Sequence, residues 1–372
     1  MSQKDNRARQ AGRVDLVHLV DLVCFVYLVD SVHLLSFAQP KKPDRLDKPN
    51  NGLLRLAGFF SILLAGNQRE EMEHIHMQWK LILGTIAMGL AVGVCTLSAT
   101  STLGGSAPPL PRPNHIVMVI EENHSYSQII ESPDAPYINS LAAQGAVFTQ
   151  SFGVTYPSQP NYLALFSGST QGITDNSCPH TFTTPNLGHA LLEAGLTFAG
   201  YSEDLPSVGS LICSVGLYAR KHNPWVNWQD SVANGLPATA NLPLTDFPTE
   251  YSELPTVNMI VPNQVNDMHN GKNPAAIQTG DRWLQEHLDA YVQWAERHNS
   301  LLIVTWDEDN KKENNRIVTL FVGPMVQAGR YEQRITHYNV LRTIEDLYGL
   351  SHAGASAEAA PIIQIWKVPP RP

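Results

Sequence analysis

Continuous apolar runs separated by polar turns dominate the hydrophobic pattern of the downstream part of the chain. His115–Ile120, Val257–Val261 and Leu301–Trp306 hold apolar residues at nearly every position instead of alternating them. Such runs are typical of strands buried on both faces of a parallel sheet. Arg316–Val322 predicts a further strand, and Thr197–Tyr201 predicts a short one.

Helical spacing of apolar residues appears between these strands. It predicts four helices, at Tyr137–Gln144, Leu187–Ala194, Asp281–Arg297 and Tyr338–Tyr348. Strands that alternate with helices predict an α/β fold in which a mostly parallel sheet carries helices on both faces. In such sheets ligands bind beyond the carboxyl ends of the strands.

One further helix is expected to begin within Tyr156–Ser169, where prolines give way to an apolar helical pattern. Pro160 suits the first helical position and Gly168 suits the end. This places Ser158 just ahead of a helix N-terminus, where free N–H groups favour an anion. Ser158 is then either an ordinary capping serine or a nucleophile that attacks a phosphorus held at that terminus.

The front of the chain has a pattern that fits neither strand nor helix. Residues 15–35 repeat with a period of three residues, which buries no single face of either element. Asp21 and Asp30 argue against a transmembrane helix there, because charges at membrane depth are costly. A translated short DNA repeat gives such a period, so we interpret residues 1–76 as a non-native extension from a mis-assigned start.

Residues 77–101 have the order of a secretory signal peptide. Met77 is followed by Lys80, the apolar run Leu81–Val94 and small residues, and the run is short for a membrane span. Cys95 offers a lipoprotein alternative, which the bulky Val94 disfavours. We therefore expect a secreted or periplasmic protein, with a flexible segment at 102–112 and one catalytic domain at 113–372.

Charge and cysteine content narrow the possible partners. The formal net charge of −9 argues against nucleic acid as a partner, since phosphate backbones bind basic surfaces. Only Cys178 and Cys213 remain in the expected mature chain. In an exported protein they predict one disulfide, and the alternative is two free buried thiols.

Polar groups gather where three of the predicted strands end. Oxygen donors follow the first strand at Glu122 and Asn123 and another strand at Asp307 and Glu308. The third strand, Val257–Val261, leads to the polar segment that ends at His269, and Ser158 adds a hydroxyl. Crowded carboxylates repel one another unless a proton or a cation lies between them. An all-oxygen set suits one divalent ion, with Mg²⁺, Ca²⁺ or Mn²⁺ favoured over Zn²⁺.

Such an ion would lower the pKa of the Ser158 hydroxyl and make it a nucleophile without a Ser-His-Asp triad. His222, His269 and His337 are candidates for phosphate contacts and for protonating the leaving oxygen. For a single histidine the structural role is the commoner one. The surrounding polar motifs favour a functional role for His222 and His269.

The motifs together resemble the bacterial and fungal phosphoesterase family of the alkaline phosphatase superfamily, which holds secreted acid phosphatases and phospholipases C. The resemblance rests on five segments in matching order, Glu122–Tyr126, Pro157–Tyr162, Tyr218–Pro224, Asn266–His269 and Trp306–Glu308. It implies a three-layer α/β/α sandwich and a phosphoseryl intermediate on Ser158. It also implies metal ligands at Glu122, Asn123, Asp307 and Glu308, and histidines facing the phosphoryl group at His222 and His269.

Two departures from the superfamily shape the expected function. Asn263 stands where two-metal members place an aspartate, and Asp307-Glu308 stands where they place an aspartate-histidine pair, so a one-metal site is expected. The chain ends soon after residue 350 and lacks the C-terminal β domains of large phospholipases C.

We therefore expect an acid phosphatase that acts on a small phosphoester, with membrane contact only if the substrate is a lipid. The alternatives are a phospholipase C-type phosphodiesterase and a non-catalytic phosphate-binding relative.

Overall fold

The computed structural model describes residues 110–367. The expected extension at 1–76, the signal peptide at 77–101 and most of the segment 102–112 lie outside these residues. Within residues 110–367, none of the helices combines the length and the apolar character that a membrane span requires.

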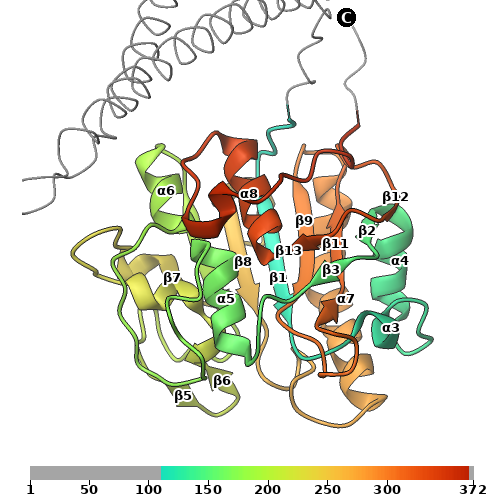
Figure 1. Cartoon of the computed structure of the whole chain (residues 1–372), viewed down its shortest axis with the longest axis horizontal. Helices are drawn as coiled ribbons and strands as arrows, with labels where there is room; N and C mark the ends of the chain where they lie inside the picture. The colour runs from blue at the N-terminus through green and yellow to red at the C-terminus, as the bar shows by residue number, and fades with distance from the viewer. Residues whose placement is uncertain (1–109, 368–372) are drawn as a thin grey trace, which may run out of the picture. The chain divides into compact units, whose positions relative to one another are not determined.

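An eight-stranded sheet runs through the middle of the domain (Figure 1), in the order β12-β2-β11-β9-β1-β8-β4-β7. Its central strands are β9 (Leu301–Trp306), β1 (Ile116–Glu121), β8 (Val257–Val261) and β4 (Phe198–Ser202), and they are parallel to one another. Only β11 (Thr319–Val322) runs antiparallel to its neighbours in this sheet. The predicted mostly parallel sheet is therefore confirmed.

The two faces of β1 separate two apolar layers. Ile116, Met118 and Ile120 pack into one core with α5 (Ser158–Ser167), α6 (Leu187–Glu193) and α8 (His337–Tyr348). Val117 and Val119 pack into the other core with α4 (Pro136–Gln144) and α7 (Ala275–Ala295). Alternate side chains of a strand point to opposite faces, so both layers grow from one buried run. The arrangement is the predicted α/β/α sandwich.

Shorter elements complete the domain. They are α3 (Tyr126–Ile129), β2 (Ala146–Phe148), β3 (Ser151–Phe152), β5 (Ser214–Val215), β6 (Tyr218–Ala219), β7 (Asn241–Pro243), β10 (Arg316–Ile317), β12 (Gly329–Tyr331), β13 (Ile335–Thr336), and the 3₁₀ helices η2 (Arg220–His222), η3 (Pro224–Trp228), η4 (Ala238–Ala240), η5 (Leu244–Asp246), η6 (Tyr251–Glu253) and η7 (Gly354–Ala357). The predicted disulfide joins Cys178 and Cys213, which confirms the pairing over the free-thiol alternative.

Three predicted elements differ from the structure. The run Arg316–Val322 divides at Val318 into β10 of a small second sheet and β11 of the main sheet. The helix predicted from Asp281 begins earlier, at Ala275, and Gly280 inside it lies against Met268, where a Cβ atom would come within 2.6 Å of that side chain. This close approach presses α7 against the loop that follows β8.

The third difference concerns α5. The helix begins at Ser158 itself, with Pro157 as its N-cap residue, so the prediction that Pro160 takes the first helical position is wrong. A proline is tolerated anywhere in the first turn, because the N–H groups of that turn have no partner within the helix. Gly168 ends the helix with φ +65°, as predicted.

Candidate active site

Three neighbouring parallel strands deliver acidic groups to one edge of the sheet. Glu122 follows β1, Asp267 lies in the loop after β8, and Asp307 follows β9. Because β8, β1 and β9 are adjacent and parallel, their carboxyl ends lie together, and the N-terminus of α5 lies at the same edge (Figure 1).

Glu122 is fully buried and is the centre of the site. Its Oε2 accepts hydrogen bonds from the Ser158 hydroxyl at 3.1 Å and from the Asn123 side-chain amide at 3.0 Å. Its Oε1 accepts one from the Tyr162 hydroxyl at 2.6 Å and lies 2.9 Å from Nε2 of His222. Burial raises the pKa of Glu122, but the facing His222 outweighs burial and lowers the pKa to about 2. Glu122 is therefore an ionised carboxylate.

His222 lies between two carboxylates. On its other side, Nδ1 lies 3.4 Å from Oδ2 of Asp267, and the ring stacks on Tyr162 with centroids 5.1 Å apart. Burial lowers the pKa of His222, but the charges of Glu122 and Asp267 raise it to about 8. The imidazole is accordingly held as a cation at neutral pH.

Asp307 and Glu308 bring two more buried carboxylates. Oδ1 of Asp307 accepts the backbone N–H of Asn123 at 3.1 Å, whereas its buried Oδ2 has no hydrogen-bond partner among residues 110–367. Burial and the charge of Glu122 raise the pKa of Asp307 well above its ordinary value and that of Glu308 to about 8. Without a cation these groups hold protons, because three adjacent buried carboxylates cannot all ionise.

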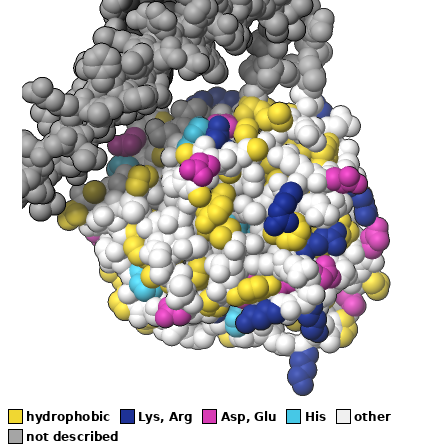
Figure 2. Space-filling model, viewed as in Figure 1, with side chains coloured by type: hydrophobic (Ala, Val, Ile, Leu, Met, Phe, Trp, Pro, Cys, Tyr) yellow, Lys and Arg dark blue, Asp and Glu magenta, His cyan; other side chains and the backbone are white. Residues whose placement is uncertain are grey.

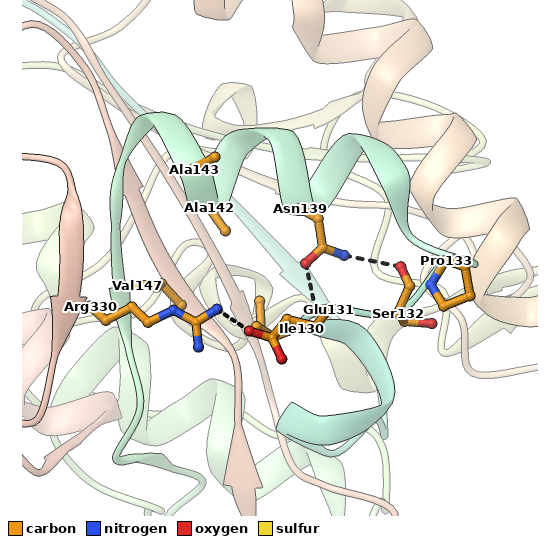
Figure 3. Close-up of a pocket in the computed structure, with 9 residues that line it drawn as sticks. All are labelled: Ile130, Glu131, Ser132, Pro133, Asn139, Ala142, Ala143, Val147 and Arg330. Atoms are coloured by element: carbon orange, nitrogen blue, oxygen red, sulfur yellow. Dashed lines mark hydrogen bonds and ion pairs between the residues drawn. The ribbon is translucent and has the colours of Figure 1, made fainter.

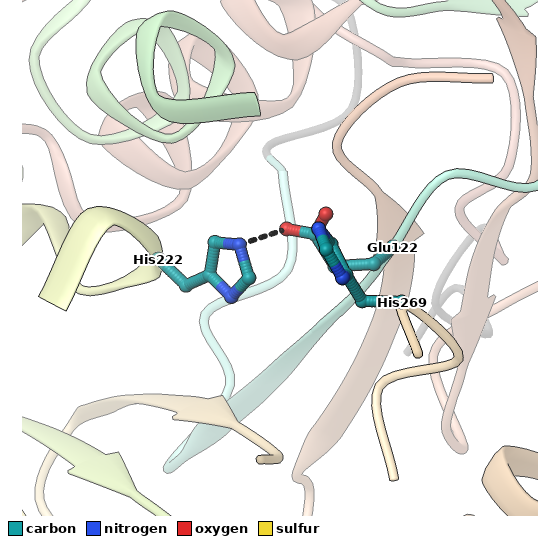
Figure 4. Close-up of side chains that lie close together, drawn as sticks. All are labelled: Glu122, His222 and His269. Carbon is teal, nitrogen blue, oxygen red and sulfur yellow. Dashed lines mark ion pairs between the residues drawn. The ribbon is translucent and has the colours of Figure 1, made fainter. Parts of the chain in front are cut away.

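The two other predicted histidines occupy different positions. His269 is half-buried, lies with Glu122 and His222 in one cluster (Figure 4), and its Nε2 is 3.3 Å from Nζ of Lys221. His337 is buried at the start of α8, where its Nε2 lies 2.7 Å from the carbonyl oxygen of Asp307. Burial lowers the pKa of His337 to about 4, so it is neutral. The structure places it as a support for the Asp307 loop.

These contacts stand beside what the sequence shares with known proteins. Residues 130–351 match the profile of the phosphoesterase family. A protein of Mycobacterium tuberculosis named phosphatidylinositol-3-phosphatase is 48% identical over 77% of this chain and 93% of its own length. The chain belongs to the phosphoesterase family. It is accordingly a phosphoric ester hydrolase.

Two further similarities were found. An acid phosphatase of Aspergillus fumigatus is 26% identical over 68% of this chain, and the match spans 58% of that enzyme. A solved structure of an alkaline phosphatase superfamily protein from Vibrio parahaemolyticus aligns with 11% identity and a TM-score of 0.48, over 71% of this chain and 76% of that one. The strand order of the main sheet and the helices on its two faces define the fold of this phosphoesterase.

The donor groups of the phosphoesterase fit a metal ion. Glu122, His222 and His269 each place one donor atom within 4.8 Å of the others. The predicted oxygen set shares Glu122 with this group. Hydrogen bonds link Glu122 to Ser158 and Asn123, and Asn123 to Asp307, and the buried Glu308 follows Asp307 in the chain. Oδ2 of Asp307, which is buried and has no hydrogen-bond partner among the described residues, is an oxygen that a cation could bind. The geometry thus supports a cation site around Glu122.

Asn263, the position at which the resemblance implies an aspartate in two-metal members, belongs to a separate network. Its side-chain amide donates to Asp204 at 2.9 Å, and its backbone N–H donates to Glu203 at 2.9 Å. These carboxylates follow β4, one strand farther along the sheet than β8. Asn263 therefore links the β8 loop to the end of β4 through hydrogen bonds to two acidic side chains.

The N-terminus of α5 offers fewer free donors than expected. The N–H of Gln159 donates to Asn176 at 3.0 Å, and Pro160 has no N–H. An anion bound beside Ser158 would therefore rely on charged side chains more than on this helix terminus.

Sequence reasoning missed two groups of the site. Tyr162 lies in the apolar helical pattern of Tyr156–Ser169, yet its hydroxyl binds Glu122. Asp267 lies in the segment Asn266–His269 without an expected role, yet it faces His222. A buried tyrosine usually needs a hydrogen-bond partner, which is the signal that could have identified Tyr162.

A pocket of about 550 Å³ lies elsewhere on the phosphoesterase, between α4 and β12 (Figure 3). Arg330 reaches across it to pair with Glu131, and Asn139 accepts the backbone N–H of Glu131 at 2.6 Å. None of the residues that line it belongs to the Glu122 cluster. It has no part in the chemistry proposed below.

Proposed function

We propose that the chain is an exported, metal-dependent phosphomonoesterase of the acid phosphatase type, which acts through a phosphoseryl intermediate on Ser158. The observation that carries the proposal is the 3.1 Å contact between the Ser158 hydroxyl and Glu122, in a site where Asp307 and Glu308 are also buried. Export rests on the signal-peptide pattern of residues 77–101.

In this mechanism the Ser158 oxygen forms a bond to phosphorus while the bond between phosphorus and the ester oxygen breaks. A bound divalent ion would lower the pKa of the serine hydroxyl and neutralise charge on the phosphoryl group. Glu122 orients the hydroxyl, and the His222 cation faces the charge that develops on the phosphoryl oxygens.

His269, the less buried of the two clustered histidines, would protonate the leaving oxygen. Water then attacks the phosphoserine, which releases inorganic phosphate and restores the Ser158 hydroxyl. His337 would act indirectly, by holding the Asp307 backbone.

For the substrate, we propose a phosphomonoester carried by a lipid headgroup. The support is the 48% identity with a protein named phosphatidylinositol-3-phosphatase. A phosphodiesterase of the phospholipase C type must leave room for a second ester group, so the comparison of p-nitrophenyl phosphate with p-nitrophenylphosphorylcholine separates the two activities. Faster turnover of the diester would contradict the monoesterase proposal.

The test of the mechanism is Ser158→Ala with Ser140→Ala, a serine on α4, as the matched control. We expect Ser158→Ala to abolish turnover and phosphoserine trapping by mass spectrometry, and Ser140→Ala to leave both intact. EDTA should inactivate the wild type, and Mg²⁺, Ca²⁺ or Mn²⁺ should restore it.

Unchanged turnover in Ser158→Ala would contradict the assignment of Ser158 as the nucleophile. Full activity in excess chelator would contradict the metal requirement. Vanadate inhibition that depends on Ser158 would exclude a non-catalytic phosphate-binding protein.

A further inference from the structure

An uncharged loop with exposed apolar side chains ends three residues before His222. From Leu205 to Ala219 the chain has no charged residue, and Asp204 and Arg220 flank it. We name residues 208–217 the apolar loop. Five of its large apolar side chains are exposed, namely Val208 (47%), Leu211 (52%), Ile212 (43%), Val215 (41%) and Leu217 (37%). A single exposed leucine is ordinary, whereas five within ten residues form a patch.

The backbone of the apolar loop is tied down although its side chains are not buried. The disulfide anchors Cys213 to Cys178, and β5 pairs with β6 as an antiparallel hairpin. The buried Arg220 donates from Nη1 to the carbonyl of Leu211 at 2.9 Å and from its backbone N–H to the carbonyl of Cys213 at 2.9 Å. The loop therefore holds its apolar side chains outward on a rigid support.

The apolar loop borders the active site. The Leu217 carbonyl accepts the backbone N–H of Gln264, from the loop that carries His269, at 3.1 Å. Lys221 follows the hairpin and lies 3.3 Å from His269. In Figure 1 β5 and β6 lie at the edge of the domain toward which the carboxyl ends of β1 and β8 point. A surface that meets the apolar loop would therefore also face the site.

We propose that the apolar loop docks the enzyme on a phospholipid bilayer, so that a headgroup phosphate enters the site from the membrane surface. The inference rests on the proposed function, because it takes a lipid-borne phosphoester as the substrate. Exposed apolar side chains on an uncharged loop partition into the boundary between headgroups and acyl chains.

Charge is not the main attraction in this docking. The formal net charge is −9, and on the face drawn in Figure 2 acidic and basic side chains lie interspersed. Lys221 supplies a local cation at the rim of the site. Binding should accordingly persist at high salt, where purely electrostatic attachment fails.

The experiment measures co-sedimentation of the wild-type protein, Ile212→Asp and Ile363→Asp with phosphatidylcholine vesicles. Ile363 is the matched control, since it is 57% exposed in the C-terminal segment and undergoes the same change. We expect Ile212→Asp to weaken vesicle binding by about tenfold or more and Ile363→Asp by less than about twofold. Leu217→Ser should give a smaller loss in the same direction.

Hydrolysis of soluble p-nitrophenyl phosphate separates the two proposals and reports folding. Ile212→Asp should retain this rate and lose rate on phosphatidylinositol 3-phosphate held in vesicles. Equal vesicle binding by the wild type and Ile212→Asp overturns the docking proposal. The docking proposal is also overturned if the wild type is a dimer that Ile212→Asp dissociates while vesicle binding stays the same. Vesicle binding by a wild type that hydrolyses no phosphomonoester would overturn the proposed function alone.

Discussion

The Tyr162 hydroxyl gives the sharpest test of how the site is organised. It donates to Oε1 of Glu122 at 2.6 Å, and both groups are buried. Glu122 is ionised because His222 holds its pKa at about 2. The bond is therefore charge-assisted, which makes it short and strong. Tyr162→Phe removes only this bond and keeps the ring that stacks on His222.

A hydrogen bond to a charged group contributes roughly 1.5–3 kcal/mol, and each 1.36 kcal/mol is a factor of ten. If the bond fixes Glu122 for both Ser158 and the metal, Tyr162→Phe should lower kcat/KM on p-nitrophenyl phosphate by about 10- to 150-fold. Part of this loss should be recovered at high metal concentration. The reason is that a less fixed Glu122 side chain lowers the affinity for the metal more than it lowers the reactivity of the Ser158 hydroxyl. The assay is kcat/KM as a function of Mg²⁺ concentration.

Tyr126→Phe is the matched control. Tyr126 is also buried and near the site loop, but its hydroxyl has no hydrogen-bond partner among the described residues. Its loss should leave kcat/KM within about twofold, since removing an unpaired polar group is nearly neutral. Equal effects of the two changes, or less than a twofold loss in Tyr162→Phe at every metal concentration, would refute the role assigned to the Tyr162–Glu122 bond.

Three further predictions concern charge, metal and covalent structure. His222→Gln should retain the bound metal, measured by elemental analysis, and lower kcat by about 100-fold or more through loss of a cation at the phosphoryl group. Removing both Cys178 and Cys213, which are 35 residues apart, should lower the free energy of unfolding in urea by about 4 kcal/mol. Burial and the charge of Glu122 raise the pKa of Glu308 from 4.5 to about 8, so the metal-free folded protein holds a proton that the unfolded chain releases. Its stability should therefore fall as pH rises from about 4.5 to 8, and saturating Mg²⁺ should remove this dependence; a rise over that range would contradict the assignment.

The meeting of distant acidic groups followed from the sequence because the rules for parallel sheets are strong. Continuous apolar runs predict β1, β8 and β9. Because these strands are parallel neighbours, the polar residues that follow them must lie at the same edge of the sheet. The short outer strands β2, β12 and β13 could not be predicted in this way. Each has three residues or fewer, and their pairing depends on partners far away in the chain.

The contacts inside the site were harder to predict than its location. Every residue of α5 is buried, so its sequence cannot distinguish the side that packs on the core from the side that faces the site. The Tyr162–Glu122 bond spans 40 residues and exists only once α5 lies over β1. The fixed start of α5 was missed for a similar reason, because a proline fits any position of the first turn.

The surroundings of His222 distinguish two possible metal sites. In one, His222 and His269 ligate the ion together with Glu122, and in the other the ligands are the oxygens of Glu122, Asp307 and Glu308. Its ring nitrogens each face a carboxylate, with Nε2 2.9 Å from Glu122 and Nδ1 3.4 Å from Asp267. An imidazole that ligates a metal must offer a lone pair, so His222 could ligate through Nε2 only as the neutral ring, with Nδ1–H kept toward Asp267. A neutral ligand of that kind would no longer be the cation that the charges of Glu122 and Asp267 favour at this position. The oxygen set around Glu122, Asp307 and Glu308 needs no such loss, because an ion there replaces protons. The arrangement therefore favours a hard cation on the oxygen side of Glu122, with His222 as the fixed positive charge on the other.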